Sequence, residues 1–227
     1  FENQQVNSIL WARDGRSIAF ARLVGSRGYE VHLIAADGTS RDSLLFRGPG
    51  LISSPQAWSE DGRWLLMTCS DPAGNYDLWR MPMTGGGKPE VYQKTAAQER
   101  AASLSPDGAW VVYGAEENGK AGLYVQSFPE PHAKYQVTSA GDGAVWNLRG
   151  DALLSGDASG QAYETPVVTA NGFQQGAPRR VFRLQKGGRF MDVDRRGRRT
   201  LVFSAKDLSA ASSLEVVLGW PQLLEKR

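Results

Sequence analysis

The sequence predicts an all-β fold in which one unit of four strands is repeated about five times along 227 residues. A turn pair ending in glycine begins at positions 14, 61, 107, 149 and 196, so the spacing is 42 to 47 residues. Runs rich in β-branched and aromatic residues, which are typical of strands, follow these turns. No amphipathic helical pattern of useful length interrupts the repeats. Four strands in about 40–50 residues is the period of a propeller blade. We therefore expect a β-propeller of about five four-stranded blades, either complete or a fragment of a larger propeller.

The first two strands of each unit are joined by the glycine turn. Asp-Gly is a strong hairpin signal, because glycine adopts positive φ freely and aspartate tolerates it. The last two units carry Arg-Gly instead, so their assignment depends on spacing and on the neighbouring strands. The turns and following strands are Trp11–Gly15 with Ser17–Phe20, Trp58–Gly62 with Trp64–Met67, Leu104–Gly108 with Trp110–Tyr113, the weaker Trp146–Gly150, and Val193–Gly197 with Thr200–Phe203.

Each unit then offers a third strand, a break rich in Gly or Pro, and a short outer strand such as Glu90–Gln93. The third strands are Glu30–Ile34, Asp77–Met81, Gly122–Gln126, Tyr163–Val168 and Leu214–Leu218. The whole chain, 1–227, is therefore predicted as one propeller domain with approximate blades 1–53, 54–99, 100–143, 144–188 and 189–227.

The fifth blade lacks residues for its outer strand. Pro221 ends its third strand, and Phe1–Gln5 are barely enough to supply a closing strand from the other end of the chain. We expect the natural protein to continue upstream. An unpaired outer edge also invites pairing with another chain, so self-association through the edge of the fifth blade is a further expectation.

Composition excludes several classes of function. The chain has 26 Lys and Arg against 24 Asp and Glu, so its net charge of +2 indicates no general affinity for nucleic acid or anionic membranes. Basic residues are dense from Arg179 to Arg199, but aromatic residues do not alternate with them as in a single-strand binding surface, so no specific nucleic-acid partner is expected. Cys69 is the single cysteine, which excludes an internal disulfide framework. No apolar run reaches the ~18 residues of a membrane span.

The sequence offers no catalytic or metal-binding constellation. The Gly-x-Ser-x-Gly motif of serine hydrolases is absent. His32 alternates with apolar strand residues and is expected to be a packed or an edge strand residue, whereas His132 follows a proline in a predicted exposed turn. The carboxylates near Asp71, Asp77, Asp192 and Asp194 lack the dense ligand series of a calcium loop and are interpreted as turn caps or salt bridges. We therefore expect no catalytic residue, metal or cofactor.

Two repeated positions are informative. We call the residue before each turn glycine, at positions 14, 61, 107, 149 and 196, the glycine-turn residue. The position three residues before it is interpreted as a packing position between blades, and it is occupied by Trp11, Trp58, Leu104, Trp146 and Val193. The position seven residues before each glycine-turn residue is polar in all five units. Innermost strands surround the propeller axis, so these side chains are predicted to form a ring at one mouth of the channel, where ligands commonly bind. The candidate ligand-binding residues are Asn7, Ser54, Arg100, Asp142 and Arg189, with Glu99 beside Arg100.

Ser105–Tyr113 resembles the TolB-type, WD-like propeller repeat, whose usual form is Ser-Pro-Asp-Gly followed by apolar and aromatic residues. A narrower resemblance, over about residues 75 to 227, is to the C-terminal propeller of bacterial eukaryotic-like serine/threonine kinases. It is carried by Tyr76–Trp79, Glu99–Ala102, Leu123–Pro129 and Val216–Trp220. The kinase's own motifs are absent from this chain. The resemblance therefore implies a non-catalytic sensor or scaffold of a signalling protein, located outside the cytoplasmic membrane, that binds a protein, peptide or small molecule.

Two alternatives stay open. The chain could be the gating propeller of a prolyl oligopeptidase-type serine peptidase, which would require a hydrolase domain after Arg227. It could also be a stand-alone TolB-like periplasmic protein. The full-length gene product distinguishes all three.

Overall fold

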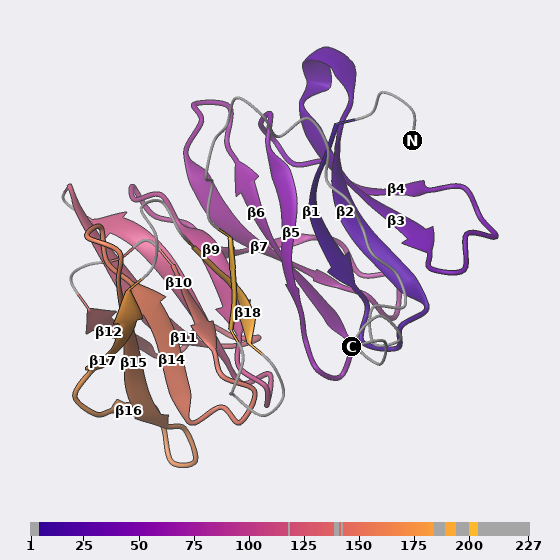
Figure 1. Cartoon of the computed structure of the whole chain (residues 1–227). Coiled ribbons are helices and arrows are strands. Elements are labelled where there is room, and N and C mark those ends of the chain that lie inside the picture. Colours follow the sequence, from indigo (N-terminus) through magenta and orange to yellow (C-terminus); the bar gives the residue numbers. More distant parts are fainter. Residues whose placement is uncertain are drawn as a thin grey trace, which may run out of the picture.

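The computed structural model describes residues 5–117, 119–138, 141, 143–183, 189–193 and 200–203, the last two segments by their backbone. Apart from one short 3-10 helix, Gly25–Arg27, the regular structure of these residues is β-strand (Figure 1). No helix in this part of the chain is long and apolar enough to cross a membrane. The all-β prediction is confirmed.

The strands form antiparallel sheets in chain order. The first three sheets have the orders β1-β2-β3-β4, β5-β6-β7-β8 and β9-β10-β11-β12, and we call them blades 1, 2 and 3. Their strands are β1 Val6–Trp11, β2 Ser17–Leu23, β3 Tyr29–Ala35, β4 Ser43–Phe46, β5 Ser53–Trp58, β6 Trp64–Ser70, β7 Tyr76–Pro82, β8 Glu90–Gln93, β9 Arg100–Leu104, β10 Trp110–Glu117, β11 Lys120–Ser127 and β12 Lys134–Thr138.

Blade 4 has a divided outer edge, because two short strands pair with different parts of its third strand. It comprises β13 Ala144–Trp146, β14 Ala152–Gly156, β15 Gln161–Val168, β16 Gln174–Gln175 and β17 Arg179–Arg183. The described part of blade 5 is the pair β18 Arg189–Val193 and β19 Thr200–Phe203.

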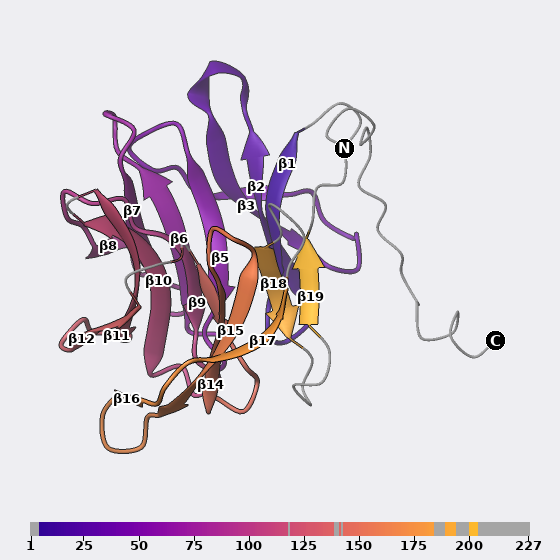
Figure 2. The same ribbon diagram turned by 60° about the vertical axis from the view of Figure 1, so that its left-hand side comes forward.

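The sheets are arranged radially. Successive innermost strands contact one another, β1 with β5, β5 with β9, β9 with β13 and β13 with β18. In Figure 2 the outer strands β8, β12 and β16 lie at the periphery, while the innermost strands gather toward the middle of the molecule. This arrangement is that of propeller blades around a common axis, as predicted.

Apolar side chains fill the space between neighbouring blades. Val31 of blade 1 packs with Met67 of blade 2, and Leu78 of blade 2 packs with Val111 of blade 3. Between blades 3 and 4, Trp146 belongs to a cluster of buried residues that also includes Trp110, Val112, Leu123, Val125, Leu153, Val167 and Phe173. Each blade is therefore stabilised mainly by its neighbours, as expected for a repeat architecture.

The predicted packing position behaves differently in the first repeat. Trp58 and Trp146 are buried, with 7% and 5% of their surface exposed, and Leu104 packs against the core between blades 2 and 3. Trp11, however, is 54% exposed, and nearby Ile9 is 47% exposed. The prediction that Trp11 is a core residue is therefore wrong for the described structure. Trp58 is covered by blade 1, which precedes its own blade. Within the described part of the chain, no sheet covers Trp11 in the same way.

Several predictions concern residues that the structure does not describe. Phe1–Asn3 and the predicted third strand of blade 5, Leu214–Leu218, lie outside the described residues. Ring closure, continuation upstream and self-association through the edge of blade 5 therefore remain predictions.

Candidate functional site

Four of the five predicted ring residues occupy one register position. Each lies on an innermost strand and is paired with a residue of the second strand. That partner lies seven positions after the glycine-turn residue of the same blade. The pairs are Asn7 with Ala21, Ser54 with Thr68, Arg100 with Gly114, and Arg189 with Phe203. Because the innermost strands contact one another in order, these residues start neighbouring strands at one end of the propeller, which we call the mouth end. Asp142 lies outside the described residues.

A β-bulge follows the ring position in four blades. Two residues of the innermost strand oppose one residue of the second strand there, in β1, β5, β9 and β18. Ser8 and Ala101 adopt positive φ, +49° and +53°, directly after Asn7 and Arg100. Bulges re-aim neighbouring side chains and are frequent beside functional sites. Positive φ at residues other than glycine is a strained conformation of the kind that clusters at such sites.

A chain of hydrogen bonds joins blades 1 and 2 at the mouth end. Gln56 Nε2 donates to Ser54 Oγ at 3.4 Å, Ser54 Oγ donates to Ser8 Oγ at 2.7 Å, and Ser8 Oγ donates to Asn7 Oδ1 at 3.4 Å. This chain fixes the relative position of two neighbouring ring residues, Asn7 and Ser54. It leaves the amide group of Asn7, an exposed residue, at its outer end.

Arg100 presents its guanidinium at the same end. Its side chain is 46% exposed, and Nη2 lies 3.9 Å from Glu116 Oε2 in a long ion pair. Exposed ion pairs contribute little free energy, so an incoming anionic group could replace Glu116 at small cost. Of Arg189 only the backbone position is described, on β18.

Glu99 lies behind the mouth rather than on it. It is fully buried, with 0% of its surface exposed, and its N–H donates to Tyr76 O in blade 2 at 2.8 Å. The Thr95 hydroxyl donates to Glu99 Oε1, whereas Oε2 has no hydrogen-bond partner among the described residues. Burial raises the pKa of this carboxyl above its ordinary value. Glu99 is therefore placed to position the start of β9, and a ligand contact remains a prediction.

Sequence reasoning missed an ion pair between a buried acid and a half-exposed base that recurs in blades 1 and 2. Glu30 Oε1 lies 2.7 Å from Arg47 Nε, and Asp77 Oδ2 lies 2.7 Å from Lys94 Nζ. In both blades the acid is the second residue of the third strand and the base directly follows the fourth strand, 17 residues later. The signal is therefore present in the sequence as a spacing. Blade 3 has Gly122 at the corresponding place in its third strand.

His32 is buried, as predicted, with 3% of its surface exposed. Its Nδ1 lies 2.8 Å from Asp42 Oδ2, without the alignment of a hydrogen bond, and its Nε2 lies 3.6 Å from Glu30 Oε2. Both ring nitrogens thus face carboxylates of blade 1. His132 lies in an exposed turn, also as predicted. Within the described residues no group of three or more His, Cys, Asp or Glu could hold a metal ion.

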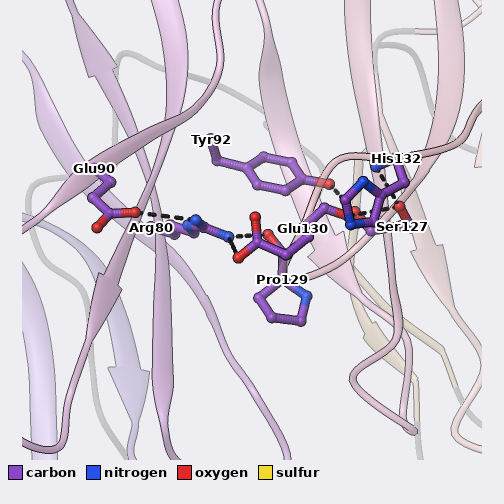
Figure 3. Close-up of polar contacts among 7 residues, drawn as sticks. All are labelled: Arg80, Glu90, Tyr92, Ser127, Pro129, Glu130 and His132. Atoms are coloured by element: carbon purple, nitrogen blue, oxygen red, sulfur yellow. Dashed lines mark hydrogen bonds and ion pairs between the residues drawn. The ribbon is translucent and has the colours of Figure 1, made fainter.

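A second polar contact between blades surrounds Arg80 (Figure 3). Its guanidinium bonds to Glu90 Oε2 at 3.0 Å within blade 2 and to Glu130 Oε1 at 2.8 Å in blade 3, and it also donates to Pro129 O. Beside it, Tyr92 OH donates to Ser127 O at 2.6 Å, again from blade 2 to blade 3. The Arg80 side chain is only 11% exposed, so this cluster joins the two blades rather than offering a binding surface.

The comparisons with known proteins support the propeller fold. No protein-family model matches the sequence, and no curated protein matches it. Among solved structures, the chain is similar to a candidate TolB from Agrobacterium tumefaciens, with a TM-score of 0.60 and 17% identity over 76% of this chain and 65% of that one. A gluconolactonase from Xanthomonas campestris gives a TM-score of 0.60 and 15% identity over 87% of this chain and 68% of that one.

A structure from a study of two prolyl endopeptidases gives a TM-score of 0.55 and 15% identity over 84% of this chain and 30% of that one. The chain thus spans just under two thirds of the TolB structure and under one third of the endopeptidase. At such identities the similarities establish the fold alone.

Proposed function

We propose that this chain is a non-catalytic recognition module, a TolB-like β-propeller that binds a protein or peptide at its mouth end. The observation that carries this proposal is the shared register of Asn7, Ser54, Arg100 and Arg189 on neighbouring innermost strands. The repeat itself brings these polar residues to one end, on strands that each contain a bulge, and such a group of residues is suited to hydrogen bonding with a ligand.

The chemistry of these residues favours a partner with acidic groups. Two of the four are arginines, and guanidinium binds carboxylates through paired hydrogen bonds. Asn7, which is exposed, adds a neutral donor and acceptor suited to a peptide backbone, whereas Ser54 is buried and holds Ser8 and Gln56 in place. The TolB-like and gluconolactonase structures have the same fold but do not decide between binding and catalysis, so the proposal depends on the residues at the mouth.

The test is selection of peptides from a displayed library on the wild-type protein, followed by affinity measurements on Arg100→Ala and Arg189→Ala. A charged hydrogen bond contributes ~1.5–3 kcal/mol, so each variant should bind the selected acidic peptides at least about tenfold more weakly. Arg63→Ala is the matched control, because Arg63 follows the glycine turn at the opposite end of blade 2. Unchanged affinity in both ring variants would overturn the proposal.

A finer version adds that the module senses a ligand outside the cytoplasmic membrane as part of a serine/threonine kinase-type signalling protein. This version depends on the sequence resemblance described above, and the structural similarities give it no specific support. Its test is the gene sequence on either side of this chain. An upstream kinase domain and membrane helix would support it. An upstream signal peptide alone would favour a stand-alone TolB-like protein, and a downstream hydrolase domain would favour a peptidase propeller.

A further inference from the structure

A pocket of about 150 Å³ lies between blades 3 and 4, and none of the described ring residues lines it. Blade 3 contributes the end of β12, and blade 4 contributes the facing parts of β14 and β15. Among the described residues the pocket is lined by Val137, Thr138, Ser155, Gly156, Asp157, Tyr163, Thr165 and Pro178.

The pocket exists because one repeat lacks a side chain that the others have. Six residues after the glycine-turn residue, the second strand carries Phe20 in blade 1, Met67 in blade 2 and Tyr113 in blade 3, all buried. Blade 4 has Ser155 at this position. The opposing residue on the third strand is bulky in every case: His32, Trp79, Tyr124 and Tyr163, respectively.

Blade 3 shows what normally fills the space. The rings of Tyr113 and Tyr124 stack with centroids 6.0 Å apart and planes at 28°, and the Tyr113 hydroxyl donates to Gln126 Oε1 at 2.8 Å. In blade 4 the counterpart of Tyr124, Tyr163, faces a serine instead. The empty volume therefore corresponds to the place of a tyrosine ring beside Tyr163.

The strand register confirms that this space is interior to the blade junction. Ser155 opposes Ala144 on β13, and Leu153, which lies on the same face two residues earlier, opposes Trp146. Both Leu153 and Trp146 pack against blade 3. The pocket thus continues the apolar junction between blades 3 and 4, with hydroxyl groups in place of the apolar side chains.

The polar wall is held in a fixed geometry. Asp157 Oδ1 accepts hydrogen bonds from the N–H groups of Ser159 and Gln161 at 2.9 and 3.0 Å and from Ser159 Oγ at 2.7 Å. These bonds lower the pKa of the Asp157 carboxyl, so it is ionised at neutral pH. Its Oδ2 accepts from Tyr163 OH at 3.0 Å, which fixes the tyrosine ring and leaves this oxygen able to accept a further donor.

We propose that this pocket binds a single phenol-type ring, which stacks on Tyr163 in the place that Tyr113 occupies in blade 3. The ligand's hydroxyl donates to Asp157 Oδ2 or Ser155 Oγ, and Val137 and Pro178 supply apolar contact. A cavity of ~150 Å³ is the size that holds one benzene ring in a protein interior. The ring could belong to a tyrosine of a bound peptide or to a free phenol, which share this chemistry.

The experiment is titration of the 15N-labelled protein with p-cresol and, separately, with N-acetyl-tyrosinamide, observed through amide shifts of Thr138 and Gly156. We expect p-cresol to shift these amides with a dissociation constant of ~1 mM, given the affinity open to a ligand of this size. Shifts with N-acetyl-tyrosinamide as well would identify a peptide tyrosine as an acceptable source. Shifts with p-cresol alone would identify a free phenol.

Two variants and one control decide the location. Ser155→Tyr supplies the missing ring from within and should abolish the shifts. Tyr163→Leu removes the stacking surface without filling the pocket, and should weaken binding about two- to tenfold, because an aromatic pair contributes ~0.5–1.5 kcal/mol beyond area burial. Thr84→Tyr adds the same ring at an exposed turn of blade 2 and should leave binding unchanged. Circular dichroism confirms that each variant is folded.

The outcomes separate this site from the mouth ring. Arg100→Ala should bind p-cresol like the wild type even where it fails to bind selected peptides. Absence of shifts up to the solubility of p-cresol, shifts confined to another blade, or full binding by Ser155→Tyr would each overturn the proposal. Binding of glucose but not of p-cresol would also overturn it, because the pocket would then recognise hydroxyl groups rather than an aromatic ring.

Discussion

The buried carboxyl of Glu99 links the stability of the protein to pH. Its folded-state pKa is raised above the ordinary value of 4.5, chiefly by burial, so the folded state binds this proton more tightly than the unfolded state. The contribution of Glu99 to stability is therefore greatest when the group is protonated. It declines as pH rises through 4.5 and on through the raised folded-state pKa.

We expect Glu99→Gln to remove this decline, because glutamine keeps an acceptor for the Thr95 hydroxyl without a titrating proton. Relative to the wild type, the variant should become more stable as pH rises from acidic to neutral, as measured by urea unfolding at several pH values. Glu60→Gln, at an exposed turn position, is the matched control and should not show this trend. Parallel pH profiles for Glu99→Gln and the wild type would show that the Glu99 carboxyl is hydrated in solution.

The glycine turns of blades 2 and 3 are stabilised by a serine that blade 1 lacks. In blades 2 and 3 the hydroxyls of Ser59 and Ser105 donate to Asp61 and Asp107 and accept the N–H of the first residue of the next strand at 2.9 Å. Ala12 stands at this place in blade 1. Ser59→Ala and Ser105→Ala should each lower the free energy of unfolding by ~1–2 kcal/mol, because a buried N–H loses its acceptor.

The converse substitution is Ala12→Ser, which supplies a hydroxyl beside Asp14 and the following strand. We expect it to raise the free energy of unfolding by ~0.5–1 kcal/mol, the typical net value of one hydrogen bond. Urea unfolding of the three variants is the measurement. Destabilisation by Ala12→Ser would mean that the contact of Ala12 with the apolar core matters more than the turn.

At the scale of elements, Arg80 on β7 couples blades 2 and 3 through a guanidinium that is only 11% exposed. Besides Glu90, Glu130 and Pro129 O, its guanidinium lies 5.1 Å from the centroid of the Trp64 ring. Arg80→Ala should lower the free energy of unfolding by ~2–4 kcal/mol, because it removes charged hydrogen bonds and the packing over Trp64. Arg63→Ala breaks an ion pair with 67% of the arginine side chain exposed and should cost less than about 1 kcal/mol. Equal losses in the two variants would contradict this account of the blade junction.

Elements differ in how well the sequence predicts them. The second and third strands were predictable because burial on both faces makes them apolar and the glycine turns fix their register, as in Trp64–Met67 within β6. Outer strands such as β4 and β17 carry mixed side chains, and the divided edge of blade 4 has no counterpart in the repeat. Their position depends on pairing with the third strand rather than on a pattern of their own.

The same contrast holds for the candidate sites. The register of Asn7, Ser54 and Arg100 was predictable because a repeat places equivalent residues equivalently. The burial of Glu99 was not, because it depends on contacts with the preceding blade at Thr95 and Tyr76. Ser155 departs from a bulky repeat position, but its consequence needed the structure, which shows a pocket beside it among the described residues.

For the whole molecule, three tryptophans at one repeat position report which blade junctions exist. Trp58 and Trp146 are buried between blades, so Trp58→Ala and Trp146→Ala should each lower the free energy of unfolding by ~3–5 kcal/mol through lost packing. Trp11 is more than half exposed, so Trp11→Ala should cost less than about 1.5 kcal/mol. The measurement is urea unfolding of the three variants, with tryptophan emission of the wild type expected to include a solvent-exposed, red-shifted component that Trp11→Ala removes. A loss for Trp11→Ala as large as that for Trp58→Ala would show that this face of blade 1 is covered in solution, because an exposed side chain loses little packing energy when it is truncated.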